Sequence, residues 1–355
     1  MWAVDPSGEN DAETGVPDAR NLTPVEGARA SIYSVPKNAP DIIIVGLNDR
    51  DPRFSDVYSV DIASGERSLL RENDDQVGSW VFDLNGKLRL ATKQNPAGGT
   101  ELYRVDLSGL TKLAEATYEE SLWPIRFHPD GEHVYVVSNV GDDVDLSRLM
   151  LMEVATGDME LIESDPENQV DFANASFHPE TDELMATAYL GDRTRVYPQT
   201  DEAERIWKAM RKALPDGDIG ITSMTQDMSK MLVAVSSDVD PGSVYLFDPE
   251  TGEATLQYRS RPELPSEHLA PMEPVTFTAR DGMEIHGYLT LPKGVEPKNL
   301  PTVMYIHGGP WARDTWGYEP YAQFLANRGY AVMQVNYRSS TGYGKHYLNA
   351  GNKEW

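Results

Sequence analysis

The segment PTVMYIHGGPWARDTWG, residues 301–317, holds the residue types of this sequence that are best suited to chemistry. An apolar strand, residues 302–306, runs directly into a turn that contains Gly308 and Gly309. Glycine lets the backbone approach a ligand closely and turn its N–H groups toward it. Such groups suit the oxygen that becomes negative in acyl transfer, where one preorganised donor lowers the barrier by about 3 kcal/mol. The alternative is a plain Gly-Gly-Pro turn, because short glycine motifs are common.

The other parts of a serine hydrolase site are not found in this sequence. No serine has a glycine two residues before it and two after it, so the nucleophile motif G-x-S-x-G is missing. His128 and His178 open repeated His-Pro turns, and His286 lies in a predicted hairpin. We therefore expect structural roles for all the histidines, which are His128, His133, His178, His268, His286, His307 and His346.

The elements around the glycine turn alternate between strands and helices. PVTFTAR and MEIHGYLTL flank the Asp281-Gly282 turn as a hairpin. A helix closed by Gly329 and a further strand follow the turn, which is the alternation of an α/β sheet. A proline-rich stretch precedes the hairpin, so we predict a linker at 264–273 and the start of an α/β domain at 274–355.

Residues 1–263 carry two pattern series that stay in step. One series places VDIASGE, VDLSG, EVATGD and DPETGE at spacings of 45, 47 and 95 residues, the last being about twice the period. The other series, anchored at Phe82, Phe127, Phe177 and Met224, has spacings of 45, 50 and 47 residues. This period is typical of four-stranded propeller blades, so we predict a partial β-propeller of about five blades or a little more. Unrelated hairpins in a sandwich are the alternative.

One blade contains a predicted helix. In DEAERIWKAMRKALPDG, Asp201 and Glu204 have the spacing of N-cap and N3, and Ile206, Met210 and Leu214 share one face. We expect an inserted surface helix, and a lid is the alternative.

Composition limits the classes of partner. The 355 residues have 31 basic and 57 acidic side chains, a net charge of −26, which disfavours nucleic acid and anionic membranes. With no cysteine, thiolate chemistry and disulfides are excluded, and we expect a cytoplasmic protein. We expect no cofactor and no metal, because the acidic stretch at 141–147 lacks the pattern of an EF-hand loop. The oligomeric state is left open.

The run from PVTFTARDGMEIHGYLTLP through HGGPWARDTWG to NYRSSTGYG resembles the opening of the catalytic domain of prolyl oligopeptidase family serine peptidases, nearest the acylaminoacyl-peptidase-like bacterial members. That resemblance implies that the Gly309 amide is an oxyanion donor and that His307 and Gly308 shape the turn. It places Pro310, Trp311 and Arg313 at the substrate cleft, with Tyr337 and Arg338 as further cleft candidates. Ser339 stands where the family has glycine.

The fold class expected is a β-propeller, seven-bladed in the whole protein, followed by the N-terminal part of an α/β-hydrolase domain. By resemblance, the nucleophile, acid and histidine lie beyond Trp355, and the chain looks cut at both ends. We expect the whole protein to hydrolyse short peptides through an acyl-enzyme, and the 355 residues alone to be inactive. An esterase and a non-catalytic propeller module are the alternatives. Strand 302–306 is expected to leave an open apolar edge.

Overall fold

The computed structural model describes residues 1–5, 7–11, 13 and 15–354. Its contacts divide the chain into two compact units. The first unit holds residues 1–140 and 149–162, and the second unit holds residues 141–148 and 163–355. None of the helices among the described residues has the length and hydropathy needed to cross a lipid bilayer.

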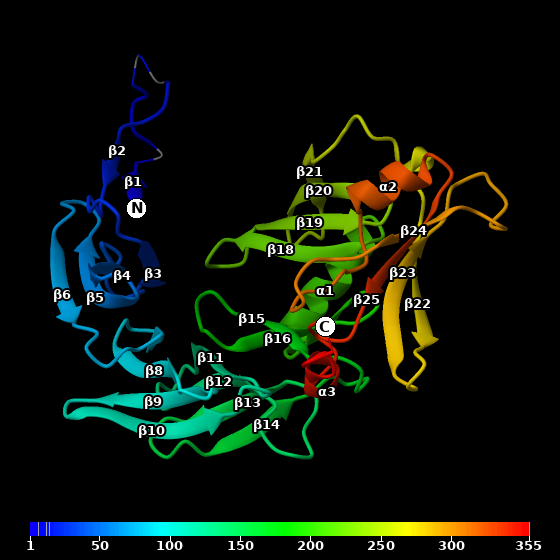
Figure 1. Cartoon of the computed structure of the whole chain (residues 1–355). Coiled ribbons are helices and arrows are strands. Elements are labelled where there is room, and N and C mark those ends of the chain that lie inside the picture. Colours follow the sequence, from blue (N-terminus) through cyan, green and yellow to red (C-terminus); the bar gives the residue numbers. More distant parts are fainter. Residues whose placement is uncertain (6, 12, 14, 355) are drawn as a thin grey trace. The chain divides into compact units, whose positions relative to one another are not determined.

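The first unit is built from antiparallel sheets of consecutive strands (Figure 1). A short hairpin pairs β1 (Trp2–Val4) with β2 (Ala19–Asn21). The next sheet holds β3 (Ala30–Ser34), β4 (Ile42–Asp51), β5 (Phe54–Asp61) and β6 (Arg67–Arg71). Another holds β7 (Ser79–Phe82), β8 (Leu88–Gln94), β9 (Thr100–Asp106) and β10 (Gly109–Ala116). A third four-stranded sheet holds β11 (Leu122–Phe127), β12 (His133–Ser138), β13 (Arg148–Glu153) and β14 (Met159–Glu163).

Each of the two sequence series corresponds to one particular turn of a blade. The first series forms the turns from the third to the fourth strand, as between β5 and β6, where the Ser64 N–H and the Gly65 N–H both donate to Asp61. Asp and Gly suit such turns because Asp accepts local backbone N–H groups and Gly adopts positive φ; φ is 77° at Gly65. The second series forms the turns from the first to the second strand. The propeller-blade prediction is therefore confirmed.

The second unit continues the pattern with one exception. One sheet has only three strands, β15 (Phe172–Phe177), β16 (Leu184–Leu190) and β17 (Thr194–Pro198). The next has four, β18 (Asp218–Met224), β19 (Met231–Ser237), β20 (Asp240–Phe247) and β21 (Ala254–Arg259). Helix α1 (Asp201–Ala213) follows β17 in the position where the fourth strand is expected. This replacement accounts for the doubled spacing of 95 residues in the first sequence series.

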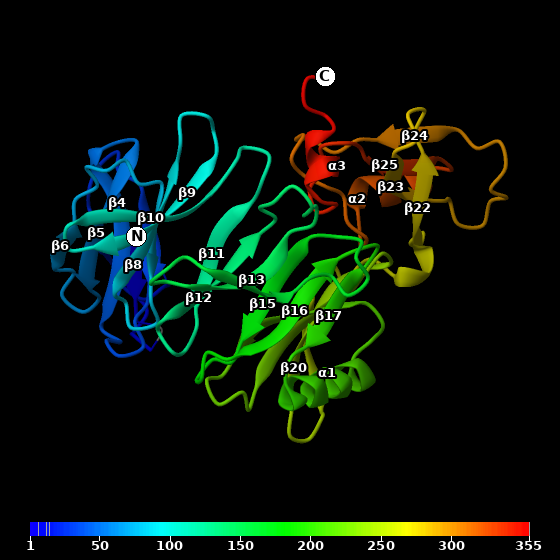
Figure 2. The ribbon, with the colours of Figure 1, turned by 90° about the horizontal axis from the view of Figure 1, so that it is seen from below.

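Helix α1 packs with its apolar face against the neighbouring sheets (Figure 2). Ala203, Ile206 and Met210 are buried in one core with Met231 and Phe247. The helix was predicted correctly, but its N-cap was not. Thr200 is the N-cap, and its side chain accepts the Ala203 N–H at 3.1 Å.

The C-terminal sheet is of a different type. After a 3₁₀ turn at Ser266–His268, it is formed by β22 (Met272–Thr278), β23 (Glu284–Thr290), β24 (Thr302–Tyr305) and β25 (Ala331–Asn336). Its order is β22-β23-β25-β24, and only the β24 and β25 pair is parallel. Helix α2 (Pro320–Ala326) connects β24 to β25, and α3 (Lys345–Asn349) follows β25. This is the predicted start of an α/β-hydrolase domain, and the linker bounds at 264–273 stay a prediction.

The acidic stretch at 141–147 contacts the beginning of α3. The Asp145 carboxylate accepts the His346 N–H at 2.8 Å, and its carbonyl accepts the Lys345 N–H at 3.1 Å. The Lys345 ammonium group donates to the Gly141 carbonyl at 2.7 Å. These contacts explain why 141–148 belongs to the second unit.

Candidate active site

The candidate site lies at the carboxyl ends of β24 and β25. The two strands are parallel and in register from Thr302 with Ala331 to Tyr305 with Gln334. Their carboxyl ends therefore lie side by side, which brings residues 307–310, called here the oxyanion turn, next to Tyr337. Ligands of open α/β sheets bind outside the carboxyl ends of strands.

His307 is fixed at both ring nitrogens. Nδ1 lies 2.8 Å from the Gly308 carbonyl, which can only accept, so Nδ1 carries the proton. Nε2 then accepts the Ser340 hydroxyl at 2.9 Å. The Tyr337 ring stacks on the imidazole at a centroid distance of 4.5 Å, and its hydroxyl donates to the His307 carbonyl at 3.1 Å. These contacts suit a histidine that shapes the turn.

Ser340 forms a serine and histidine pair that sequence analysis did not single out. The hydroxyl meets an imidazole nitrogen, which is half of the geometry of an activated nucleophile. However, Ser340 is completely buried, so a substrate carbonyl has no access to its oxygen. The pair therefore holds the two strand ends together. Ser340 lies inside NYRSSTGYG, and spacing alone did not distinguish it from Ser339.

Gly309 occupies a position that only glycine fits. Its φ is 151°, and an added Cβ would lie 2.9 Å from the Trp311 nitrogen. The same atom added at Gly308 would meet nothing within 4 Å. Within residues 15–354 the Gly309 N–H donates no hydrogen bond. An N–H of this kind is free to bind an anionic oxygen, and the role of Gly309 as an oxyanion donor stays a prediction.

The remaining predicted cleft residues are placed differently from one another. Trp311 is 71% exposed and Pro310 is partly exposed. Arg338 forms an ion pair of 2.7 Å with Asp281 in the β22 to β23 turn. The cleft roles of Pro310, Trp311 and Arg338 therefore stay predictions.

Arg313 makes contacts that suit a structural role. Its guanidinium donates to the carbonyls of Leu190, the last residue of β16, and Gly191, the next residue, at 2.8 and 3.3 Å. It also donates to the Tyr343 hydroxyl at 2.6 Å and lies 4.2 Å from the centroid of that ring. Arg313 thus connects the segment after the oxyanion turn to a blade, which the cleft prediction did not anticipate.

Asp314 is a partly buried acid close to the oxyanion turn that sequence analysis missed. Its backbone N–H donates to the Asn336 side chain at 2.7 Å, and the Asn336 amide returns a bond to the Asp314 carbonyl at 3.0 Å. Burial raises the pKa of the Asp314 carboxyl, and nearby His307 opposes that rise. The one sequence signal for this acid is its position in WARD, residues 311–314, directly after the glycine turn.

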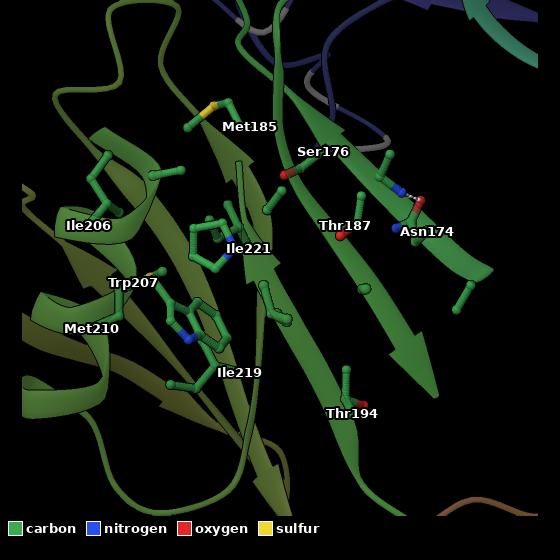
Figure 3. Close-up of a pocket in the computed structure, with 18 of the residues that line it drawn as sticks. Asn174, Ser176, Met185, Thr187, Thr194, Ile206, Trp207, Met210, Ile219 and Ile221 are labelled. Atoms are coloured by element: carbon green, nitrogen blue, oxygen red, sulfur yellow. Dashed lines mark hydrogen bonds between the residues drawn. The ribbon is translucent and has the colours of Figure 1, made fainter. Parts of the chain in front are cut away.

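An apolar cavity of about 340 Å³ lies elsewhere in the second unit (Figure 3). It is lined by β15, β16, β17, α1 and β18, with Trp207 projecting from α1 toward Ile219 of β18. None of its lining residues comes from 264–355. It therefore contributes no group to chemistry at the oxyanion turn.

Taken together, the described chain has propeller blades followed by the opening of an α/β-hydrolase sheet, with a glycine-containing turn at the carboxyl end of β24. Residues 316–355 match the model of the prolyl oligopeptidase family. Dipeptidyl aminopeptidase BIII of Pseudoxanthomonas mexicana is 36% identical over 357 residues, covering 97% of this chain and 50% of that protein. Dipeptidyl peptidase family member 6 of Caenorhabditis elegans is 29% identical over 348 residues, covering 89% of this chain and 46% of that protein.

Solved structures share the fold. The crystal structure of puromycin hydrolase superposes with a TM-score of 0.67 at 20% identity, covering 98% of this chain and 56% of that one. The chain belongs to the prolyl oligopeptidase family. It spans about half the length of the curated relatives that it matches.

Proposed function

We propose that this chain is the propeller part and the first part of the catalytic domain of a serine peptidase that hydrolyses short peptides. The observation that carries the proposal is the Gly309 N–H, which has no partner among residues 15–354. It lies at the carboxyl end of β24 in a conformation that a side chain would disturb. In acyl transfer this N–H would bind the oxygen of the tetrahedral intermediate. The family relationship supports peptide bonds as the target.

In this proposal the nucleophile, the acid and the catalytic histidine are supplied by sequence that follows residue 355. The 355 residues hold no G-x-S-x-G motif, and the buried Ser340 does not replace it. The mechanism is acylation of a serine followed by hydrolysis of the acyl-enzyme. Propeller blades beside the catalytic sheet would limit the size of the peptides admitted. We also propose a cytoplasmic location, because the sequence has no cysteine.

Within this class, the reaction that we propose first is the release of dipeptides from the amino termini of peptides. Two curated relatives that match most of this chain carry the names dipeptidyl aminopeptidase and dipeptidyl peptidase. Removal of acylated amino-terminal residues, expected from sequence resemblance, is the second candidate. Initial rates on a dipeptidyl-p-nitroanilide, an acylaminoacyl-p-nitroanilide and a simple ester would rank these reactions and the esterase alternative.

The experiment that tests the proposal is labelling with a fluorophosphonate, which reacts with activated serines. We expect the protein translated from the complete reading frame to be labelled and the 355-residue chain to remain unlabelled. Ser340→Ala in the complete protein is the matched control and should keep the label. Labelling of the 355-residue chain that Ser340→Ala abolishes would contradict the proposal, and an unlabelled complete protein would favour the non-catalytic propeller module.

A further inference from the structure

A cluster of two histidines and one aspartate lies in the turn between β11 and β12, in the first unit. His128, Asp130 and His133 each present one ligand atom, and these atoms lie within 4.8 Å of one another. We propose that this turn is a binding site for a divalent first-row transition-metal ion, with Zn²⁺ as the reference ion. The proposal is independent of the peptidase function, because none of these residues belongs to the C-terminal sheet.

The carboxylate of Asp130 is held in position by the backbone of its own turn. Its Oδ1 accepts the N–H groups of Glu132 and His133 at 2.8 and 3.0 Å. Its Oδ2 points to both imidazoles, at 2.9 Å from His128 Nδ1 and 2.7 Å from His133 Nδ1. One oxygen is thus used for orientation and the other is presented with the two nitrogens. Hydrogen bonds of this kind around a ligand fix its geometry and strengthen metal binding.

Without an ion, His133 Nδ1 lies at hydrogen-bond distance, 2.7 Å, from Asp130 Oδ2. A metal ion would bind the tautomers in which both imidazoles carry their proton on Nε2, so that the three converging atoms all present lone pairs. His128 Nδ1 also accepts the Asp130 N–H at 3.3 Å, so this nitrogen faces the inside of the turn. Three such atoms at this spacing repel one another unless a proton or a cation lies between them. A metal ion held at about 2.0–2.2 Å from each of these atoms would supply that charge.

The donor set determines the class of ion. Two imidazole nitrogens and one carboxylate oxygen suit zinc, cobalt, nickel or copper, whereas magnesium and calcium prefer oxygen ligands only. Three protein ligands leave further coordination positions for water. The side chains of the three residues are 34–38% exposed, so an ion can enter from solvent. The net charge of −26 raises the local concentration of cations.

The surrounding residues hold the two rings in place. The His128 ring contacts Tyr135 at a centroid distance of 5.8 Å and meets the His133 ring edge-on at 6.2 Å. The Arg89 guanidinium donates to the Gly131 carbonyl at 2.9 Å. The turn is therefore built before any ion binds. The sequence expectation of no metal considered the acidic stretch at 141–147 and did not weigh this cluster.

A second blade contains a natural control for this turn. Residues 178–183, HPETDE, open with the same His-Pro pair and have the same length as 128–133, HPDGEH. The His178 Nδ1 there accepts the N–H groups of Glu180 and Thr181, both at 3.1 Å. The position of the second imidazole is taken by Glu183. His178 Nδ1 thus accepts two backbone N–H groups where His128 Nδ1 accepts one, and the 178–183 turn offers no second ring.

The test is zinc binding by the 355-residue chain, prepared without a histidine tag. Binding is measured by calorimetry and by competition with a chromophoric chelator. We expect one equivalent of Zn²⁺ to bind. His133→Gln should weaken binding by at least about tenfold, since even loss of a residue that only orients a ligand costs 10–100-fold. His178→Gln should bind as the wild type does.

A second measurement separates loss of the ligand from loss of folding. Ions that bind only the folded state raise the melting temperature. At the same concentration, Zn²⁺ should raise the Tm of the wild type and of His178→Gln more than that of His133→Gln. The absorption spectrum of bound Co²⁺ should change in Asp130→Asn. Equal zinc affinity in wild type and His133→Gln, or an equal loss in His178→Gln, would overturn the proposal.

Discussion

The strands of the propeller blades and those of the C-terminal sheet find their pairing partners in different ways. Each blade joins consecutive strands by short turns, and its central strands contain fully buried residues, such as Val45, Val136 and Val233. The C-terminal sheet places β24 at its edge, out of chain order, next to β25. Met304 and Ile306, in and just after β24, are 55% and 50% exposed. The strands of a blade thus pair with their neighbours in sequence, whereas the C-terminal sheet depends on contacts between residues that are far apart in the sequence.

Those distant contacts are concentrated in a few side chains. The Gln323 amide donates to the carbonyls of Asp238 and Ala270, at 3.0 and 2.7 Å, and its oxygen accepts the Ala270 N–H at 2.8 Å. The Arg193 guanidinium lies 3.8 Å from the centroid of the Trp316 ring. The difference teaches that the C-terminal sheet should be destabilised by single substitutions that the blades would tolerate.

Trp316→Ala should have the largest effect. The indole is buried with Met272 and Tyr288, and its N–H donates to the Met272 carbonyl at 3.0 Å. Removing a buried aromatic ring of this size costs about 3–5 kcal/mol. We expect limited proteolysis to cleave residues 272–354 of the variant first. The control, Trp123→Ala in β11, removes a ring that is 45% exposed and should cost about 1 kcal/mol or less. Equal protease sensitivity of the two variants would contradict the comparison.

Gln323→Leu should have the next largest effect. The change leaves the buried Ala270 N–H without its acceptor, and an unsatisfied buried group costs about 1–3 kcal/mol. Urea unfolding followed at the C-terminal sheet should report the loss. Gln257→Leu, on the exposed strand β21, should change stability by no more than about 0.5 kcal/mol. A neutral Gln323→Leu would show that these bonds do not hold the sheet.

His286 should make the C-terminal sheet sensitive to mild acid. Burial lowers the pKa of this imidazole, which stacks on Tyr343 at 4.4 Å, while Glu284 and Asp192 oppose the shift. Below the unfolded pKa of about 6.5, the unfolded chain binds more protons than the folded chain, so stability falls as the pH falls. His286→Phe should reduce this slope, measured by urea unfolding between pH 7 and pH 5. His268→Gln, at an exposed histidine, should keep the slope, and an unchanged slope in His286→Phe would disprove the assignment.

Met304→Lys should have the smallest effect on stability and a clear effect on association. The side chain is half exposed, so we expect a change within about 0.5 kcal/mol. A lysine on an edge strand opposes pairing with another chain. Sedimentation velocity should show less self-association of the 355-residue chain. Leu107→Lys, at a fully exposed blade turn, should leave association unchanged. Equal association of Met304→Lys and wild type would exclude β24 as the contact.

Much of the fold could be predicted from the sequence because blades repeat. The turn residues recur at a fixed period, so Asp61 and Gly65 identify a strand junction without any knowledge of distant contacts. The helix at 201–213 followed from its apolar face, although Thr200 rather than Asp201 caps it. The sequence did not predict that a helix replaces the fourth strand of one blade. The doubled spacing showed only that one turn of the series was missing, and loss of a whole repeat would explain that equally well.

The candidate site was only partly predictable. The two glycines indicated the oxyanion turn, because the need for Gly309 is local. The contacts of Ser340 with His307 and of Arg313 with the β16 to β17 turn depend on how strands pair, which residue types do not encode. The approach of His128 to His133 depends on the shape of one hairpin turn, and the very similar 178–183 turn adopts another.

The role of Gly309 is the central claim, and the turnover of the complete protein by Gly309→Ala against Gly308→Ala tests it most directly. An added Cβ at Gly309 would move the N–H that is proposed to bind the oxyanion, so kcat should fall by about 10²–10³-fold with little change in KM. Gly308→Ala adds a Cβ that meets no atom within 4 Å and should lose far less. Equal losses in the two variants, or full activity of Gly309→Ala, would contradict the account.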